Sequence, residues 1–303
     1  SNGILPVHGF RGGDFEQIRR LATEAFQGAF LKRRETCARC SIVCRPVVEF
    51  DGPLSVSSDY GGPEYETVVA VGSLLDNFEP RVIAKANELC NRFGMDTITA
   101  GVCIAFAMEC TERGIDIGQQ TPWGDSTAIL SLLQDIAMRR GLGDLLADGV
   151  RMAAREIGQG SDAWALEVKG LELPMHDPRG KKGQGISFAT APRGADHMQA
   201  VHDEGFQSGG PYPELGLSQA MDRHAVEGKA RMVKITQDYF GTLADALGLC
   251  KFPMNAWRPL TPTRVVELVR LVTDWDMSLA ELQTTGERIF NLCRLFNVRE
   301  GVR

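Results

Sequence analysis

The sequence predicts an all-α, multihelical protein with two domains and minor, short β elements. Apolar residues recur at helical spacing in most segments after residue 78, and residues typical of helix starts and ends flank those segments. By contrast, the stretch 175–216 is rich in Gly, Pro, His and Asp and has little periodicity. Because 303 residues suffice for two domains, we place a boundary near residue 170, giving domains 1–170 and 171–303.

The first predicted helices lie on either side of a glycine. Pro80 suits the first turn of a helix and Gly94 suits the position just past its end, which predicts a helix over 80–93. Residues 97–113 are apolar on nearly every side, a pattern typical of a helix buried in a core.

Two more helices are expected before residue 160. Asp125 or Ser126 can cap a helix whose apolar stripe runs from Ile129 and which Gly141 is expected to end. Asp144 is expected to open the next helix. Its inward-facing residues are Leu146, Val150, Ala153, Ala154 and Ile157.

Short extended segments are predicted within 165–173, around Lys169-Gly170. The C-terminal part then returns to helix. Thr261-Pro262 is a cap followed by proline in the first turn, and Ser278 with Glu281 forms a capping box before a last helix over 282–296.

Composition excludes several classes of protein. The net charge of −6 and the lack of a basic run argue against a nucleic-acid binder. No segment approaches the roughly 18 apolar residues that cross a bilayer. The chain has no signal peptide and eight cysteines, which favours a reducing, cytoplasmic location. It starts at Ser1 without a methionine, so we expect it to be a piece of a longer protein.

Three cysteines lie within eight residues, at Cys37, Cys40 and Cys44. A [4Fe–4S] cluster needs four thiolates, and Cys250 is the best distant candidate for the fourth ligand. Three clustered thiols with one remote partner favour a cluster over the alternative, a structural zinc site. The low cysteine density disfavours a disulfide framework.

Several other polar residues are expected to be structural. Cys90, Cys103, Cys110 and Cys293 lie in apolar helical patterns, so buried inert thiols are predicted. Lys181-Lys182 is predicted to form a solvated turn, and His202-Asp203-Glu204 has no convincing metal-ligand spacing.

Several motifs occur in a characteristic order along the chain. They are the four cysteines, Gly62-Pro63-Glu64-Tyr65-Glu66-Thr67, Asn91-Arg92-Phe93-Gly94-Met95-Asp96-Thr97, His176-Asp177-Pro178-Arg179-Gly180, Arg193-Gly194-Ala195-Asp196-His197 and Asp245-Ala246-Leu247-Gly248-Leu249-Cys250. Together they resemble the tungsten-containing aldehyde:ferredoxin oxidoreductase family. The resemblance covers the two C-terminal helical domains of that family, and its N-terminal β-rich domain is expected to be absent.

The resemblance implies a role for each matching residue. Cys37, Cys40, Cys44 and Cys250 would ligate the [4Fe–4S] cluster. One pterin-binding loop would contain Asn91, Gly94 and Asp96, and the other Asp245, Gly248 and Leu249. Glu64 and His197 would lie beside the metal as catalytic residues for proton transfer and substrate orientation. His176 is left open, as a second site residue or a partner of Asp177, and Asp96 and Asp245 could also be helix caps or turn acids.

The implied function is the oxidation of aldehydes to carboxylates, with ferredoxin as electron acceptor. The full-length protein would bind tungsten, or molybdenum, in a bis-pterin cofactor. This piece alone is expected to be inactive and to need the missing N-terminal domain as a partner; a homodimer is left open. Two alternatives remain: a family member acting on another substrate, such as an aromatic acyl thioester, and a non-catalytic iron–sulfur electron-transfer module.

Overall fold

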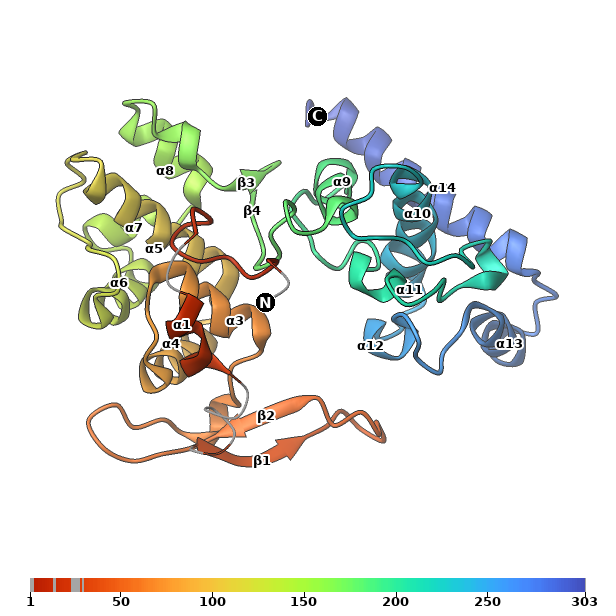
Figure 1. The fold of residues 1–303 in the computed structure, drawn as a ribbon, viewed down its shortest axis with the longest axis horizontal. Coiled ribbons are helices and arrows are strands. Elements are labelled where there is room, and N and C mark those ends of the chain that lie inside the picture. The colour runs from red at the N-terminus through yellow and green to blue at the C-terminus, as the bar shows by residue number, and fades with distance from the viewer. Residues whose placement is uncertain (1–2, 13–14, 23–27, 29, 303) are drawn as a thin grey trace. The chain divides into compact units, whose positions relative to one another are not determined.

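The protein is described by a computed structural model that covers residues 3–12, 15–22, 28 and 30–302. It divides into two compact units (Figure 1). The N-terminal unit is Leu5–Met175, and the C-terminal unit is His176–Arg303 together with the residues up to Ile4. Helices dominate both units, and strands in the described residues form two short antiparallel pairs, so the predicted all-α fold with minor β elements is confirmed.

The N-terminal unit consists of short and long helices with both strand pairs. Its helices are α1 (Phe15–Ile18), α3 (Tyr65–Ala70), α4 (Pro80–Phe93), α5 (Thr97–Glu112), α6 (Ser126–Met138), α7 (Leu142–Leu146) and α8 (Val150–Ile157). Its strands are β1 (Leu31–Glu35), β2 (Arg45–Val48), β3 (Glu167–Val168) and β4 (Leu171–Glu172).

Helix α5 forms the centre of this unit. It is buried from Ala100 to Cys110, as its continuous apolar sequence predicts, and it packs against α3, α4, α6 and α8. Gly101 permits a close approach to α3, because a Cβ there would lie 2.5 Å from the carbonyl oxygen of Ala70. In the described residues no single helix is long and apolar enough to cross a bilayer, and α4 and α5 meet that test only as a pair bent by 117°.

Two predicted helix boundaries in this unit are wrong. Helix α6 ends at Met138 rather than at Gly141, because Arg139 takes a left-handed conformation (φ 50°) that its ion pairs with Asp144 and Asp148 support. The helix expected from Asp144 onward is two helices, α7 and α8. They are separated at Gly149 (φ 87°), where the carboxylate of Glu172 accepts the N–H of Val150 at 2.9 Å.

Strands β1 and β2 form an antiparallel hairpin that closes a loop over residues 36–44. Glu35 pairs with Arg45 at the end of the ladder, next to that loop. The second strand pair, β3 and β4, turns at Lys169 and Gly170, both with positive φ, as predicted from the sequence.

The C-terminal unit has its own core. Its helices are α9 (Lys182–Thr190), α10 (Lys229–Thr236), the π-helical segment η7 (Gln237–Leu243), α11 (Ala244–Ala246), α12 (Lys251–Met254), α13 (Pro262–Thr273) and α14 (Leu279–Arg299). Helix α14 packs closely on η7, since a Cβ at Gly286 would lie 2.1 Å from the carbonyl oxygen of Asp238. The predicted cap at Thr261 and the capping box of Ser278 and Glu281 are confirmed.

Candidate functional site

The predicted site residues are divided between the two units, each of which contributes a local constellation. The N-terminal unit contains Cys37, Cys40, Cys44, Glu64, Asn91, Gly94 and Asp96, and the C-terminal unit contains His197, Asp245, Gly248, Leu249 and Cys250.

The hairpin loop presents three thiols together. Cys37 is exposed, Cys40 and Cys44 are half-buried, and none of the three forms a disulfide. The N–H of Cys40 donates to the carbonyl of Cys37 at 3.0 Å, which forms a turn between the first two thiols. Hydrogen bonds from the Ile42 N–H, the Thr36 hydroxyl and the Val43 N–H lower the pKa of the Cys40 thiol below its usual range. These hydrogen bonds therefore favour the thiolate form of Cys40, which is the form that ligates metals.

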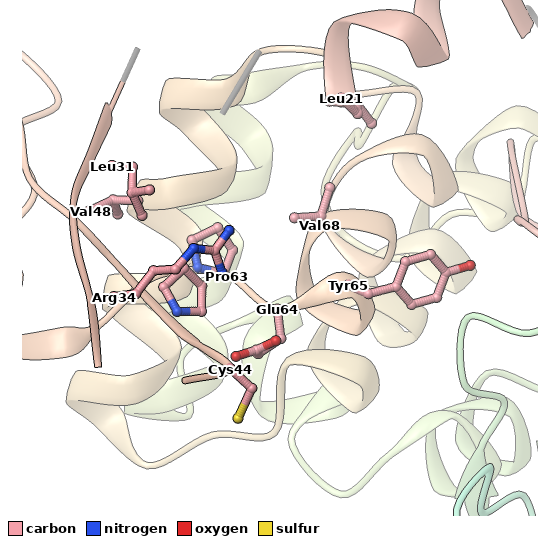
Figure 2. Close-up of a pocket in the computed structure, with 10 residues that line it drawn as sticks. Leu21, Leu31, Arg34, Cys44, Val48, Pro63, Glu64, Tyr65 and Val68 are labelled. Atoms are coloured by element: carbon pink, nitrogen blue, oxygen red, sulfur yellow. The ribbon is translucent and has the colours of Figure 1, made fainter. Parts of the chain in front are cut away.

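The end of this loop lines a pocket of about 250 Å³, and Glu64 lines the same pocket (Figure 2). The hairpin contributes Arg34 and Cys44, while Glu64 and Tyr65 come from the start of α3. The remaining lining residues are Leu21, Leu31, Pro46, Val48, Pro63 and Val68. A predicted cluster ligand and a predicted catalytic carboxylate thus line the same pocket.

Glu64 occupies the N-cap position of α3, but its side chain makes no capping hydrogen bond. Although Glu64 is exposed as a residue, partial desolvation of its carboxylate raises its pKa above the usual range, and the charges of Arg34 and Arg45 only partly oppose that shift. A raised pKa lets a carboxyl group keep its proton to a higher pH than an ordinary carboxyl group does, which suits it to proton exchange.

The loop after α4 is a glycine turn. Gly94 has a φ of 70°, and the N–H of Met95 donates to the carbonyl of Cys90 at 2.9 Å. Asn91 donates its amide to the carbonyl of Asn87 at 2.8 Å. Asp96 caps α5, because its carboxylate accepts the N–H of Thr99 at 2.7 Å.

The loop after α11 repeats this geometry in the C-terminal unit. Gly248 has a φ of 65°, and the N–H of Leu249 donates to the carbonyl of Ala244 at 2.8 Å. Cys250 then occupies the N-cap position of α12, the place that Asp96 takes before α5. The residues from Asp245 to Gly248 are all exposed, so their backbone is accessible to a ligand.

Lys251 connects the second glycine turn to the segment that carries His197. Its ammonium group donates to the carbonyl of Met198 at 3.0 Å, to the carbonyl of Gly241 at 3.2 Å and to the carboxylate of Asp245. The Lys251 side chain is only 10% exposed. The sequence analysis does not include Lys251 among the site residues, although its position directly after Cys250 could have indicated a role in the site.

His197 lies in a tightly bonded turn. Asp196 is buried, accepts the N–H of Met198 at 2.8 Å and pairs with Arg193. The His197 ring is half-buried, with its centroid 5.2 Å from that of His176. Helix α14 holds the preceding backbone through Arg294, which donates to the carbonyl of Thr190 at 2.6 Å.

The expected solvated turn at Lys181-Lys182 is wrong for Lys181. Lys182 is exposed, but the Lys181 side chain is fully buried, with its Nζ between His176 and His202. The prediction failed because the partners that bury Lys181 are separated from it in sequence. The triplet His202-Asp203-Glu204, which has no metal-ligand spacing, supplies most of those partners and those of a second buried lysine, Lys229.

The donor sets fit the groups that the motifs imply. The loop carries three free thiols, and backbone N–H groups donate to the sulfur of Cys40. This arrangement suits an iron–sulfur cluster, because hydrogen bonds to sulfur are typical of such sites. Beside both Gly94 and Gly248, a Cβ would meet nothing within 4 Å, so a flat ligand can approach either backbone closely.

Comparisons with known proteins give one consistent result. The chain matches the family model described as aldehyde ferredoxin oxidoreductase, domains 2 & 3, over residues 1–303. The tungsten-containing aldehyde ferredoxin oxidoreductases of Thermococcus kodakarensis and Pyrococcus furiosus are each 34% identical to it over 309 residues. Those alignments cover 99% of this chain and 48% of each relative, so the chain spans about half the length of these curated relatives.

Two further similarities are narrower. The aliphatic sulfonate oxidoreductase, WOR-like subunit, of Pyrococcus furiosus is 35% identical over 149 residues, which are 46% of this chain and 24% of that protein. The active-site complex BamBC of benzoyl coenzyme A reductase, solved with 1,5-dienoyl-CoA, matches with a TM-score of 0.76 at 19% identity. That match covers 99% of this chain and 50% of the solved one, and it shows a shared fold.

Proposed function

The chain belongs to the aldehyde ferredoxin oxidoreductase family, and from that membership we propose that it forms domains 2 and 3 of an enzyme that oxidises aldehydes to carboxylates. The proposed electron acceptor is ferredoxin. The missing part of the site would come from a further domain, in keeping with the half-length coverage of the relatives. The observation that carries the proposal is the pocket that Cys44 and Glu64 both line, which supports a proposed cluster ligand and a proposed proton-exchanging group in one site.

Each implied group has proposed holders in this chain. Cys37, Cys40, Cys44 and Cys250 would bind a [4Fe–4S] cluster, and the turns at Gly94 and Gly248 would bind the two pterins of a tungsten or molybdenum cofactor. When bound, these groups would supply the two-electron oxidation and the single-electron transfer to ferredoxin.

The chain's own residues would manage protons and positions. Oxidation of an aldehyde to a carboxylate requires addition of water and release of protons. Glu64, whose pKa is raised, would accept a proton in its ionised form. His197 would orient the substrate or carry a second proton. Lys251 would keep the second glycine turn in register with the His197 segment, because it binds both.

The proposal is tested on the full-length protein, purified without air. Iron, acid-labile sulfide and tungsten are measured first, followed by turnover of aldehydes, an aromatic acyl thioester and a sulfonate. We expect C250S and C44S to lose iron and sulfide, while C293S, at an exposed cysteine on α14, keeps both. We expect E64Q to lose turnover with its cluster intact, whereas E156Q, at an exposed carboxylate on α8, stays active.

Three outcomes would count against the proposal. Full iron content in C250S would show that Cys250 is not the fourth ligand of the cluster. Full aldehyde turnover in E64Q would remove its catalytic role and favour a non-catalytic electron-transfer module. Turnover of only the thioester or the sulfonate would be consistent with the proposed site residues but would show that aldehydes are not the substrate.

A further inference from the structure

Lys181 lies at the centre of a buried polar cluster in the C-terminal unit, formed with His176, His202 and Glu204. Its side chain is 0% exposed. Its Nζ lies 2.9 Å from Nδ1 of His176, 3.2 Å from Nδ1 of His202 and 3.3 Å from Oε1 of Glu204. A lysine ammonium has three N–H donors and no acceptor, so the three neighbours take one donor each.

This geometry determines which imidazole nitrogen carries the proton. Because the ammonium only donates, Nδ1 of His176 and Nδ1 of His202 must both be bare acceptors. A second contact gives the same answer for His202: its Nε2 lies 2.8 Å from the carbonyl oxygen of His197, which only accepts. His202 is therefore neutral with its proton on Nε2.

The electrostatics of the cluster agree. Burial, followed by the charge of Lys181, lowers the pKa of His176 to about 2, and the same causes lower the pKa of His202 well below its usual value. His197 also faces both rings, and the carboxylate of Glu204 contacts the same ammonium group. Neither imidazole can take a second proton without placing a charge against the ammonium.

The backbone around Lys181 is fixed independently. The carboxylate of Asp203 accepts the N–H groups of Gly183 and Gln184, each at 3.1 Å, at the start of α9. The fully buried Lys229 lies 2.5 Å from the same carboxylate. Asp203, which is not one of the three groups that Lys181 contacts, therefore holds the backbone directly after Lys181.

We propose that Lys181 is a positioning residue that holds His176 and His202 as neutral imidazoles protonated on Nε2, and that His202 in turn fixes the backbone of His197. The inference deepens the proposed function. It leaves proton exchange to Glu64 and His197 and makes His176 a permanent N–H donor that does not shuttle protons.

The wild-type protein provides the first test. Full-length protein with ¹⁵N-labelled histidine is followed by NMR from pH 5 to 8, and the rings are assigned with H176Q and H202Q. We expect a pyridine-type Nδ1 and a pyrrole-type Nε2 for both rings, with no titration over that range. A proton on Nδ1 of either ring, or protonation of either ring in that range, would overturn the proposal.

Variants then test the lysine itself. K181M removes the donor at similar size, and K182M is the matched control at the exposed neighbour. In K181M we expect at least one of the two histidines to titrate nearer its ordinary pKa, and turnover to fall roughly 10- to 100-fold. Unchanged titration in folded K181M would refute the role of Lys181. If K181M does not fold, the tautomers of His176 and His202 in the wild-type protein still test the proposal.

The NMR readout does not depend on the substrate. If the tautomers are as expected but no aldehyde is oxidised, the proposed function fails and the positioning role survives. If aldehydes are oxidised and the tautomers differ, only the positioning role fails.

Discussion

Gly94 and Gly248 end helices in the two units with the same left-handed turn, at φ of 70° and 65°. In each turn the following residue donates its N–H to the carbonyl five positions earlier, Met95 to Cys90 and Leu249 to Ala244. The next residue after that, Asp96 or Cys250, occupies the N-cap position of a new helix. The two loops therefore share a backbone conformation although their sequences have only the glycine in common over these positions.

The shared turn makes a stability prediction. Alanine at either glycine must adopt a positive φ, so we expect G94A and G248A each to lower the free energy of unfolding by about 1–2 kcal/mol. No steric clash adds to this cost, since a Cβ at either site meets nothing within 4 Å. Urea unfolding measures the change. Asparagine tolerates the conformation better, and equal losses in G248A and G248N would contradict the backbone explanation.

The buried histidines predict a loss of stability in acid. His176 and His202 stay neutral in the folded protein but protonate near pH 6.5 when unfolded, so the unfolded state binds more protons below that pH. Stability is therefore complete above about pH 6.5 and falls as the pH falls toward the folded pKa values. Together the two rings should remove about 3 kcal/mol between pH 7.5 and 5.5.

Unfolding midpoints at several pH values test this dependence. H176Q cannot titrate at that position and should remove about half of the slope. H224Q, at an exposed histidine, should leave the slope as it is. A wild-type slope in H176Q would mean that His176 protonates normally in the folded protein.

The sequence correctly predicted the structural features that depend on residues close together in the chain, such as helix ends and caps. Helix α4 runs from Pro80 to Phe93 with Gly94 left-handed, as expected, because a proline start and a glycine end act through local backbone geometry. The capping box of Ser278 and Glu281 was predictable for the same reason. The family resemblance, carried by motifs in order, is confirmed over the whole chain.

What sequence missed depends on contacts between distant segments. Nothing local shows that Lys181 is buried, because His202 and Glu204 reach it from another segment. Cys293 was expected to be buried but is exposed, since it lies on the solvent-facing side of α14. The β1–β2 hairpin, which brings Cys44 to the Glu64 pocket, has strands too short and too charged to show clear alternation.

The raised pKa of Glu64 predicts that its contribution to the free energy of unfolding changes with pH in the opposite direction to that of the histidines. Its pKa is raised in the folded protein, so below that pKa the folded state holds a proton more readily than the unfolded one. Its contribution is present at low pH and is lost as the pH rises through the folded pKa. E64Q removes this loss, so the stability of E64Q relative to wild type should increase from pH 4 to pH 7. E156Q is the matched control, and a constant difference would contradict a raised pKa.

Thiol reactivity predicts a division of the eight cysteines. Burial raises the pKa of Cys90 to about 12 and raises the pKa of Cys103 and Cys110 as well, so these three should resist iodoacetamide in the folded protein. In cluster-free protein the other five should react, and the hydrogen bonds that lower the pKa of Cys40 should increase its thiolate fraction.

Cluster binding should change that result. After anaerobic reconstitution of the full-length protein, four of the five reactive thiols become ligands, so mass spectrometry should find only Cys293 alkylated among the cysteines of this chain. Protection of Cys37, Cys40 and Cys44 with Cys250 still reactive would mean that another group completes the site. Reaction of all five after iron and sulfide are bound would mean that the cluster lies elsewhere in the protein.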